Sequence, residues 1–152
     1  MQIRCLLLLT SFLLFVGPVS ADTFYLATGS NGVAGSLYII DPATGAPLRT
    51  VGPLVDTLGN HYGLTGLAFQ LGTNTLYGST ANESPTAAGH LVIVNPNTAL
   101  VTDVGSFGLS STTLADLTFD PTSGILYGPR AGSGGTADHW LYSDSVTTGV
   151  AT

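Results

Sequence analysis

The sequence predicts an all-β protein that is built from repeats of short strands. Its apolar segments are rich in Leu, Ile, Val, Tyr and Phe, and Gly, Pro, Asn or Asp bounds each of them. Such segments are typical of strands that are joined by turns. No helical periodicity separates them after the first 21 residues. The 20 glycines and the charged fraction of only 8% favour a packed, turn-rich chain over a disordered one.

The first 21 residues are predicted to be a secretory signal peptide, with a short helix at its centre. Arg4 precedes the apolar run CLLLLTSFLLFV (5–16), Gly17-Pro18 ends that run, and the small residues of VSA (19–21) follow. This order is the pattern of a cleavable signal. The run is shorter than the roughly 20 residues that a membrane-spanning helix needs. We therefore expect a secreted, periplasmic or cell-surface protein without further membrane attachment, and an uncleaved anchor is the alternative.

The composition of the mature chain, residues 22–152, excludes several kinds of partner and reaction. It carries nine acidic residues against Arg49 and Arg130, and the sequence has no lysine. Binding to nucleic acid depends on clustered basic residues that release counterions, so no nucleic-acid partner is expected. The lack of lysine also excludes a Walker-type phosphate loop and Schiff-base chemistry. Cys5 would leave with the signal, so no disulfide would support the fold.

Internal repeats give the strongest signal in the sequence. GLAFQLGTNTLYG (66–78) aligns with DLTFDPTSGILYG (116–128), and LYIIDPATGAPLRTVG (37–52) aligns with LVIVNPNTALVTDVG (91–105). TFYLATG (23–29) matches the segment that begins at Thr75. Each repeat of about 50 residues therefore contains four predicted strands, A to D, and repeats of that length are typical of propellers and solenoids.

The predicted strands share one order in every repeat. The C strands LYII and LVIV do not alternate polar and apolar residues, which indicates burial on both faces. A four-stranded antiparallel meander that lies between two neighbours is the blade of a β-propeller. The expected strands are A at 64–70 and 114–120, B at 74–80 and 124–130, C at 37–41, 91–95 and 140–144, and D at 48–52 and 100–105.

These strands divide the mature chain into an incomplete ring. Residues 22–52 would supply strands B to D of a first blade, residues 63–106 a whole second blade, and residues 114–152 an incomplete third blade. Propellers typically need four to eight blades to close. We therefore expect the missing C-terminal blades to belong to the protein's own full-length chain. An open arc that assembles with other copies is the alternative.

The motifs resemble those of a known class of proteins. The chain resembles the blades of exported bacterial β-propeller repeat proteins of the YVTN and NHL type. The resemblance is carried by GLAF, by DPTSG with a following LYG, and by LYIIDPATG. The resemblance covers nearly all of residues 23–152. It implies the propeller fold, related in architecture to WD40 proteins, although no Trp-Asp pair ends strand C. Such a resemblance implies no particular activity.

Candidate binding residues lie in the loops between strands D and A and between strands B and C. These loops share one rim of the predicted propeller and vary between repeats, as binding loops on a rigid scaffold do. Asp116 is a further candidate, because it stands beside the innermost strand where the preceding repeat has Gly66. A solvated loop residue is the simpler interpretation of each rim candidate, and a hydrogen bond to a loop amide is the simpler interpretation of Asp116. The rim candidates are Asp56, Asn60, His61, Tyr62, Asn82, Glu83, Arg130, Asp138 and His139.

No catalytic residue, metal ligand or cofactor is predicted. The sequence lacks a G-x-S-x-G motif. His90 and His139 precede strand C in successive repeats, and outer strands diverge too far to share a metal. We therefore expect a non-catalytic binding or scaffold module for a protein, glycan or surface partner. The alternative is a propeller enzyme of the lactonase or lyase kind, which would hold a divalent cation such as Ca²⁺ in its central channel.

The repeated stretch LYIIDPATG (37–45) is predicted to be a structural turn. Asp41 would accept backbone amides, Pro42 would preset φ, and Gly45 would adopt the left-handed conformation. The second repeat has Asn95 in place of Asp41, so the negative charge is dispensable. Ala99 replaces Gly45, and we expect it to strain or reshape that turn.

Overall fold

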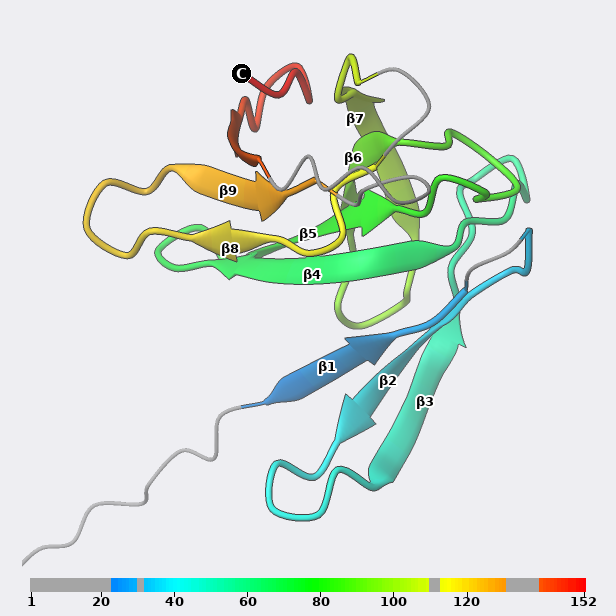
Figure 1. Cartoon of the computed structure of the whole chain (residues 1–152). Helices are drawn as coiled ribbons and strands as arrows, with labels where there is room; N and C mark the ends of the chain where they lie inside the picture. The colour runs from blue at the N-terminus through cyan, green and yellow to red at the C-terminus, as the bar shows by residue number, and fades with distance from the viewer. Residues whose placement is uncertain (1–22, 30–31, 110–112, 131–139) are drawn as a thin grey trace, which may run out of the picture.

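The fold of the chain is known from a computed structural model, which describes residues 23–29, 32–109, 113–130 and 140–152. These residues form ten strands in three antiparallel sheets, and no helix occurs among them. Figure 1 shows the three sheets in chain order, with the first below the other two. The all-β fold class is confirmed for these ranges. The predicted signal-peptide helix, Asp138 and His139 lie outside the described residues.

The first and second sheets follow the predicted strands closely. The first sheet has the order β1-β2-β3, and the second has the order β4-β5-β6-β7, so each is a simple meander. All of their pairings are antiparallel. The strands are β1 (Phe24–Ala27), β2 (Ser36–Ile40), β3 (Pro47–Pro53), β4 (Leu64–Gln70), β5 (Thr75–Thr80), β6 (His90–Val94) and β7 (Val101–Ser106).

The third sheet is shorter than the sequence predicts. It contains β8 (Thr118–Phe119), β9 (Leu126–Pro129) and β10 (Leu141–Asp144), in the order β10-β9-β8. The sequence predicts its first strand over 114–120, but only Thr118 and Phe119 pair with β9. Leu114 makes an isolated bridge to Arg130, and the register then shifts by one residue before β8 begins. A start of strand D is seen only as a bridge between Asp144 and Ala151.

A bulge interrupts the first strand of the second sheet and the first strand of the third sheet at the same repeat position. In the second sheet the register shifts between Leu64 and Gly66, which leaves Thr65 outside the ladder. The shift that follows Leu114 is its equivalent in the third sheet. A bulge bends the strand and re-aims its side chains. In both sheets this break places the residues that follow Leu64 and Leu114 beside the neighbouring sheet.

Two apolar clusters join the three sheets. The first lies between the first and second sheets and includes Leu37, Leu76 and Val94. The second lies between the second and third sheets and includes Leu91 and Leu126. The second sheet is therefore covered on both faces, as its non-alternating strand LVIV predicts. The first sheet is less covered, because the side chains of Tyr38 to Ile40 are only partly buried.

The turns after the C strands are built alike, as predicted. The carbonyl of Asp41 accepts the amide of Gly45 at 2.7 Å, and Asn95 accepts the amide of Ala99 at 2.9 Å. The Asp41 carboxylate also accepts the Ala43 amide and the Thr44 hydroxyl, which lowers the pKa of Asp41. Ala99 keeps the left-handed conformation with φ of 61°. The turn is therefore strained at Ala99 but not reshaped, and Asp41 serves it as a hydrogen-bond acceptor.

Candidate functional site

The inner edges of the three sheets enclose a groove that follows β4. β4 pairs with β5 on one side only, so its other edge is free, and β1 and β8 lie on either side of that edge. Two hollows of about 290 Å³ and about 220 Å³ open there and share Leu67 in their walls. We call the two hollows together the inner groove. Three edge strands from three sheets therefore meet at one concave surface.

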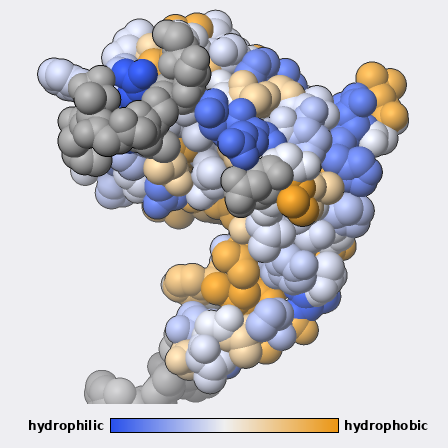
Figure 2. All heavy atoms as spheres, turned by 45° about the vertical axis from the view of Figure 1, so that its right-hand side comes forward, coloured by the Kyte–Doolittle hydropathy of each residue, from blue (hydrophilic) through white to orange (hydrophobic). Residues whose placement is uncertain are grey.

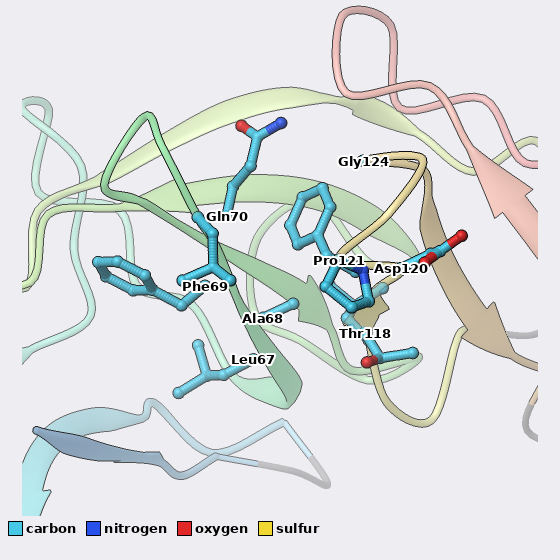
Figure 3. A pocket seen from close by; sticks show the side chains of 11 residues that line it. Leu67, Ala68, Phe69, Gln70, Thr118, Asp120, Pro121 and Gly124 are labelled. Atoms are coloured by element: carbon cyan, nitrogen blue, oxygen red, sulfur yellow. The ribbon is translucent and has the colours of Figure 1, made fainter. Parts of the chain in front are cut away.

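The larger hollow lies between the ends of β4 and β8, and polar and apolar groups share its walls. Phe69 and Leu71 come from the β4 side, and Phe119 and Pro121 come from the β8 side. In Figure 3 the Ala68 side chain of β4 points toward Thr118 across the hollow, whereas the ring of Phe69 points away from Thr118 and Pro121. Phe69 and Leu71 are 40% and 76% exposed, so both remain free to contact a ligand.

Phe119 is held in place from behind by the second sheet. Its ring packs edge-on against Tyr77, with a centroid distance of 5.6 Å and an angle of 60° between the rings. Aromatic pairs of this geometry stabilise by about 0.5–1.5 kcal/mol beyond area burial. The contact joins β5 to β8, so it links the second sheet to a residue that lines the larger hollow.

Polar groups at this hollow are few and mostly engaged. Asp120 accepts a hydrogen bond from the Ser123 hydroxyl at 2.6 Å and one from the Thr122 amide at 2.9 Å. The hydrogen bond from Ser123 is the main reason that the pKa of Asp120 is lowered, and the bond from the Thr122 amide adds to it. Both bonds keep the carboxylate charged. In Figure 3 this carboxylate points away from β4. The side-chain oxygen of Gln70 accepts a hydrogen bond from the Thr73 hydroxyl. The side-chain amide nitrogen of Gln70 is therefore the atom that can donate to a ligand.

The smaller hollow contains Asp116, the predicted candidate beside the innermost strand. Tyr25 to Ala27 of β1 face Thr65 and Gly66 across it. A Cβ on Gly66 would lie 2.6 Å from the Cα of Asp116, so the two backbones touch and only glycine fits. Thr65 donates to the carbonyl of Leu114 at 2.9 Å. Asp116 itself is exposed and accepts the Leu117 amide at 2.8 Å.

Asp56, Asn60 and Tyr62 come together in one loop, but they bind one another. The Asp56 carboxylate accepts the amides of Leu58 and Asn60, the Asn60 side chain at 2.8 Å and the Tyr62 hydroxyl at 3.2 Å. The bond from the Asn60 side chain is the main reason that the pKa of Asp56 is lowered. Burial raises the pKa of Tyr62 to about 12. These three side chains therefore build the loop, while His61 stays exposed.

The remaining rim candidates come from other parts of the chain. Asn82 and Glu83 are exposed in the turn after β5. Arg130 follows β9 directly, and its amide donates to the carbonyl of Trp140. Asp138 and His139 lie outside the described residues. Within the described ranges, no three His, Cys, Asp or Glu side chains gather closely enough to hold a metal ion.

Comparison with known proteins identifies no relative for this chain. No protein-family model and no curated protein matches it. One solved structure, the extracellular domain of a one component system from B. thetaiotaomicron, covers 84% of this chain at 14% identity with a TM-score of 0.44. The match spans only 16% of that larger protein. In the part of the chain that is described, no helix is long and apolar enough to cross a membrane.

Proposed function

We propose that this protein is an extracytoplasmic β-propeller repeat protein that acts as a non-catalytic binding or scaffold module. The inner groove is its binding site. The observation that carries the proposal is the meeting of β1, β4 and β8 at one concave surface. Ligand sites in proteins are typically concave and combine apolar walls with a few well-placed polar groups, and the groove offers both kinds of group.

The repeated construction of the sheets supports the propeller arrangement. β4 and β8 occupy equivalent repeat positions, carry the same bulge and flank the same groove. Innermost strands of successive blades would lie in this way around a central channel. Further sheets of the same kind would complete the ring, and the groove would then form part of the channel wall.

The charges of the chain indicate which ligands the groove favours. Asp116 and Asp120 lie along it, and the whole sequence carries a net charge of −6. Negative groups repel polyanions, and like charges disfavour association. Phe69, Leu71 and Phe119 offer apolar surface to a sugar ring or an apolar side chain. We therefore propose a neutral glycan or an uncharged to cationic peptide as the ligand class.

Replacement of Phe69 by Ala together with Leu71 by Ser should weaken ligand binding at least about tenfold, a loss of roughly 1.4 kcal/mol. Both side chains are exposed at the border of the groove, so their loss removes contact area while the buried clusters stay intact. The labelled protein would be tested on arrays of neutral oligosaccharides and of peptides, and the best binder would then be titrated by calorimetry.

Two controls make this test specific. Leu58→Ala alters an apolar residue that is 86% exposed and lies outside the groove, so binding should not change. Binding that survives the Phe69 and Leu71 substitutions would contradict the assignment of the groove. The titration is repeated with CaCl₂ and with EDTA, because a strict requirement for Ca²⁺ would favour the enzyme alternative over a simple binding module.

A further inference from the structure

Both ends of the row of sheets expose a face that is buried elsewhere in the same chain. One leucine position recurs in all three repeats, as Leu37, Leu91 and Leu141. In the first two sheets this leucine lies on the face toward the next sheet in chain order. Leu37 and Leu91 are both 0% exposed, because the second and third sheets cover them. Leu141 is 65% exposed. In the described part of the chain, the third sheet therefore presents the contact face of the repeat without a neighbouring sheet on it.

The opposite face shows the same pattern at the other end. Phe24, Leu76 and Leu126 occupy equivalent positions on the face toward the preceding sheet. Leu76 and Leu126 are 2% and 0% exposed, whereas Phe24 is 47% exposed. Leu26, two residues further along β1, is 42% exposed on the same face. Figure 2 shows apolar surface exposed over the first sheet, in the lower part of the view.

These two surfaces are defined by the strand registers. Directly opposed residues of neighbouring antiparallel strands share a face. The leading face is the outer surface of the first sheet and consists of Phe24, Leu26, Tyr38 and Ile40. The trailing face is the outer surface of the third sheet and consists of Tyr127, Pro129, Leu141 and Ser143. No residue of either face is charged, so burial of the two faces costs no desolvation of an ion.

We propose that the trailing face of one copy of this chain docks onto the leading face of a second copy. The contact would repeat the one that the second sheet makes with the first, where Leu37 and Tyr25 pack against Leu76 and Val94. Leu141 and Tyr127 would take the places of Leu37 and Tyr25, and Phe24 and Ile40 those of Leu76 and Val94. Both halves of the interface are thus present on one chain.

This docking is head to tail, because it joins two different surfaces. Head-to-tail interfaces close into rings when the rotation between copies allows it. Each copy contributes three sheets, so two copies together would supply six, within the four to eight that propellers typically need. The inference goes beyond the proposed function, and it would hold whatever ligand the inner groove binds.

The mass of the exported chain in solution tests the inference. Light scattering after size-exclusion chromatography should give twice the mass of one chain. Phe24→Asp and Leu141→Asp each place a charge in the interface, so each variant alone should have the mass of a monomer. Leu58→Asp alters an exposed residue outside both faces and should leave the dimer intact. Circular dichroism checks that all three variants keep their β structure.

An equimolar mixture of the two face variants distinguishes the mode of docking. The Phe24→Asp copy keeps its trailing face, and the Leu141→Asp copy keeps its leading face. One intact interface can then form, so the mixture should associate although neither variant does so alone. A monomeric wild-type chain would overturn the inference and favour coverage of the faces by further blades of the protein's own chain. Failure of the mixture to associate, or a dimer that survives both substitutions, would overturn it as well.

Discussion

Asp144→Val should stabilise the protein at neutral pH by about 1–3 kcal/mol. Asp144 is 7% exposed, and neither of its carboxylate oxygens has a hydrogen-bond partner in the described part of the chain. It lies opposite Leu126, a residue of the cluster between the second and third sheets. Its repeat equivalent is Val94, which is 1% exposed. Valine therefore suits the position, while a charge there lacks compensation.

The gain should depend on pH in a defined direction. Burial raises the pKa of Asp144 from 3.8 to about 7. Below pH 3.8 the carboxyl group is protonated in both the folded and the unfolded state, so it imposes no electrostatic cost. As the pH rises toward 7, only the unfolded state loses the proton readily, and the folded state is progressively destabilised. Above pH 7 the cost is constant, because both states are then ionised. Each tenfold difference in acidity between the two states corresponds to about 1.36 kcal/mol.

Urea unfolding of the wild-type protein and of Asp144→Val between pH 3.5 and 8 measures this dependence. The two curves of unfolding free energy against pH should diverge up to pH 7 and then run parallel. Asp120→Asn is the matched control. The pKa of Asp120 is lowered, so loss of its charge should reduce stability at neutral pH. A constant difference between Asp144→Val and wild type at all pH values would contradict the assigned titration.

Leu91→Ala should lower the free energy of unfolding by about 2–5 kcal/mol. Leu91 is fully buried on β6 and belongs to the cluster that joins the second and third sheets. Its truncation removes apolar burial and leaves a cavity between two sheets. Such a loss is large against the roughly 5–15 kcal/mol that holds an ordinary domain together. Urea unfolding at one protein concentration measures it.

Leu58→Ala provides the comparison for this substitution. Leu58 is 86% exposed, so the same chemical change there should alter stability by no more than about 0.5 kcal/mol. A Leu91→Ala variant as stable as Leu58→Ala would mean that the second and third sheets do not pack on each other through this cluster.

The strands could be predicted from the sequence because local signals specify them. The sequence predicts the strand at 64–70 with the bounds that β4 has, and it predicts the turn at Asp41 with its hydrogen bonds. It does not predict that β8 is short. Strand pairing is lost before Thr118 because of the bulge that follows Leu114. This bulge brings the backbone of Asp116 against Gly66. That contact joins two sheets, so no local pattern in 114–120 could reveal it.

The candidate site is harder to predict than the fold. The sequence points to the rim loops and to Asp116. It does not point to the larger hollow, because the walls of that hollow come from β4 and β8, which are about 50 residues apart in the sequence. A signal for Asp144 does exist, since the repeat alignment sets it opposite Val94. An acid at a position that is otherwise apolar marks a perturbed group.

The central claim is that the second and third sheets pack together and so form the inner groove. A double-mutant cycle between Tyr77 and Phe119 tests it most directly, because the two rings are 5.6 Å apart and belong to different sheets. Unfolding free energies of Tyr77→Leu, Phe119→Leu and the double variant should reveal a coupling of about 0.5–1.5 kcal/mol. Strictly additive effects of the two substitutions would contradict the account.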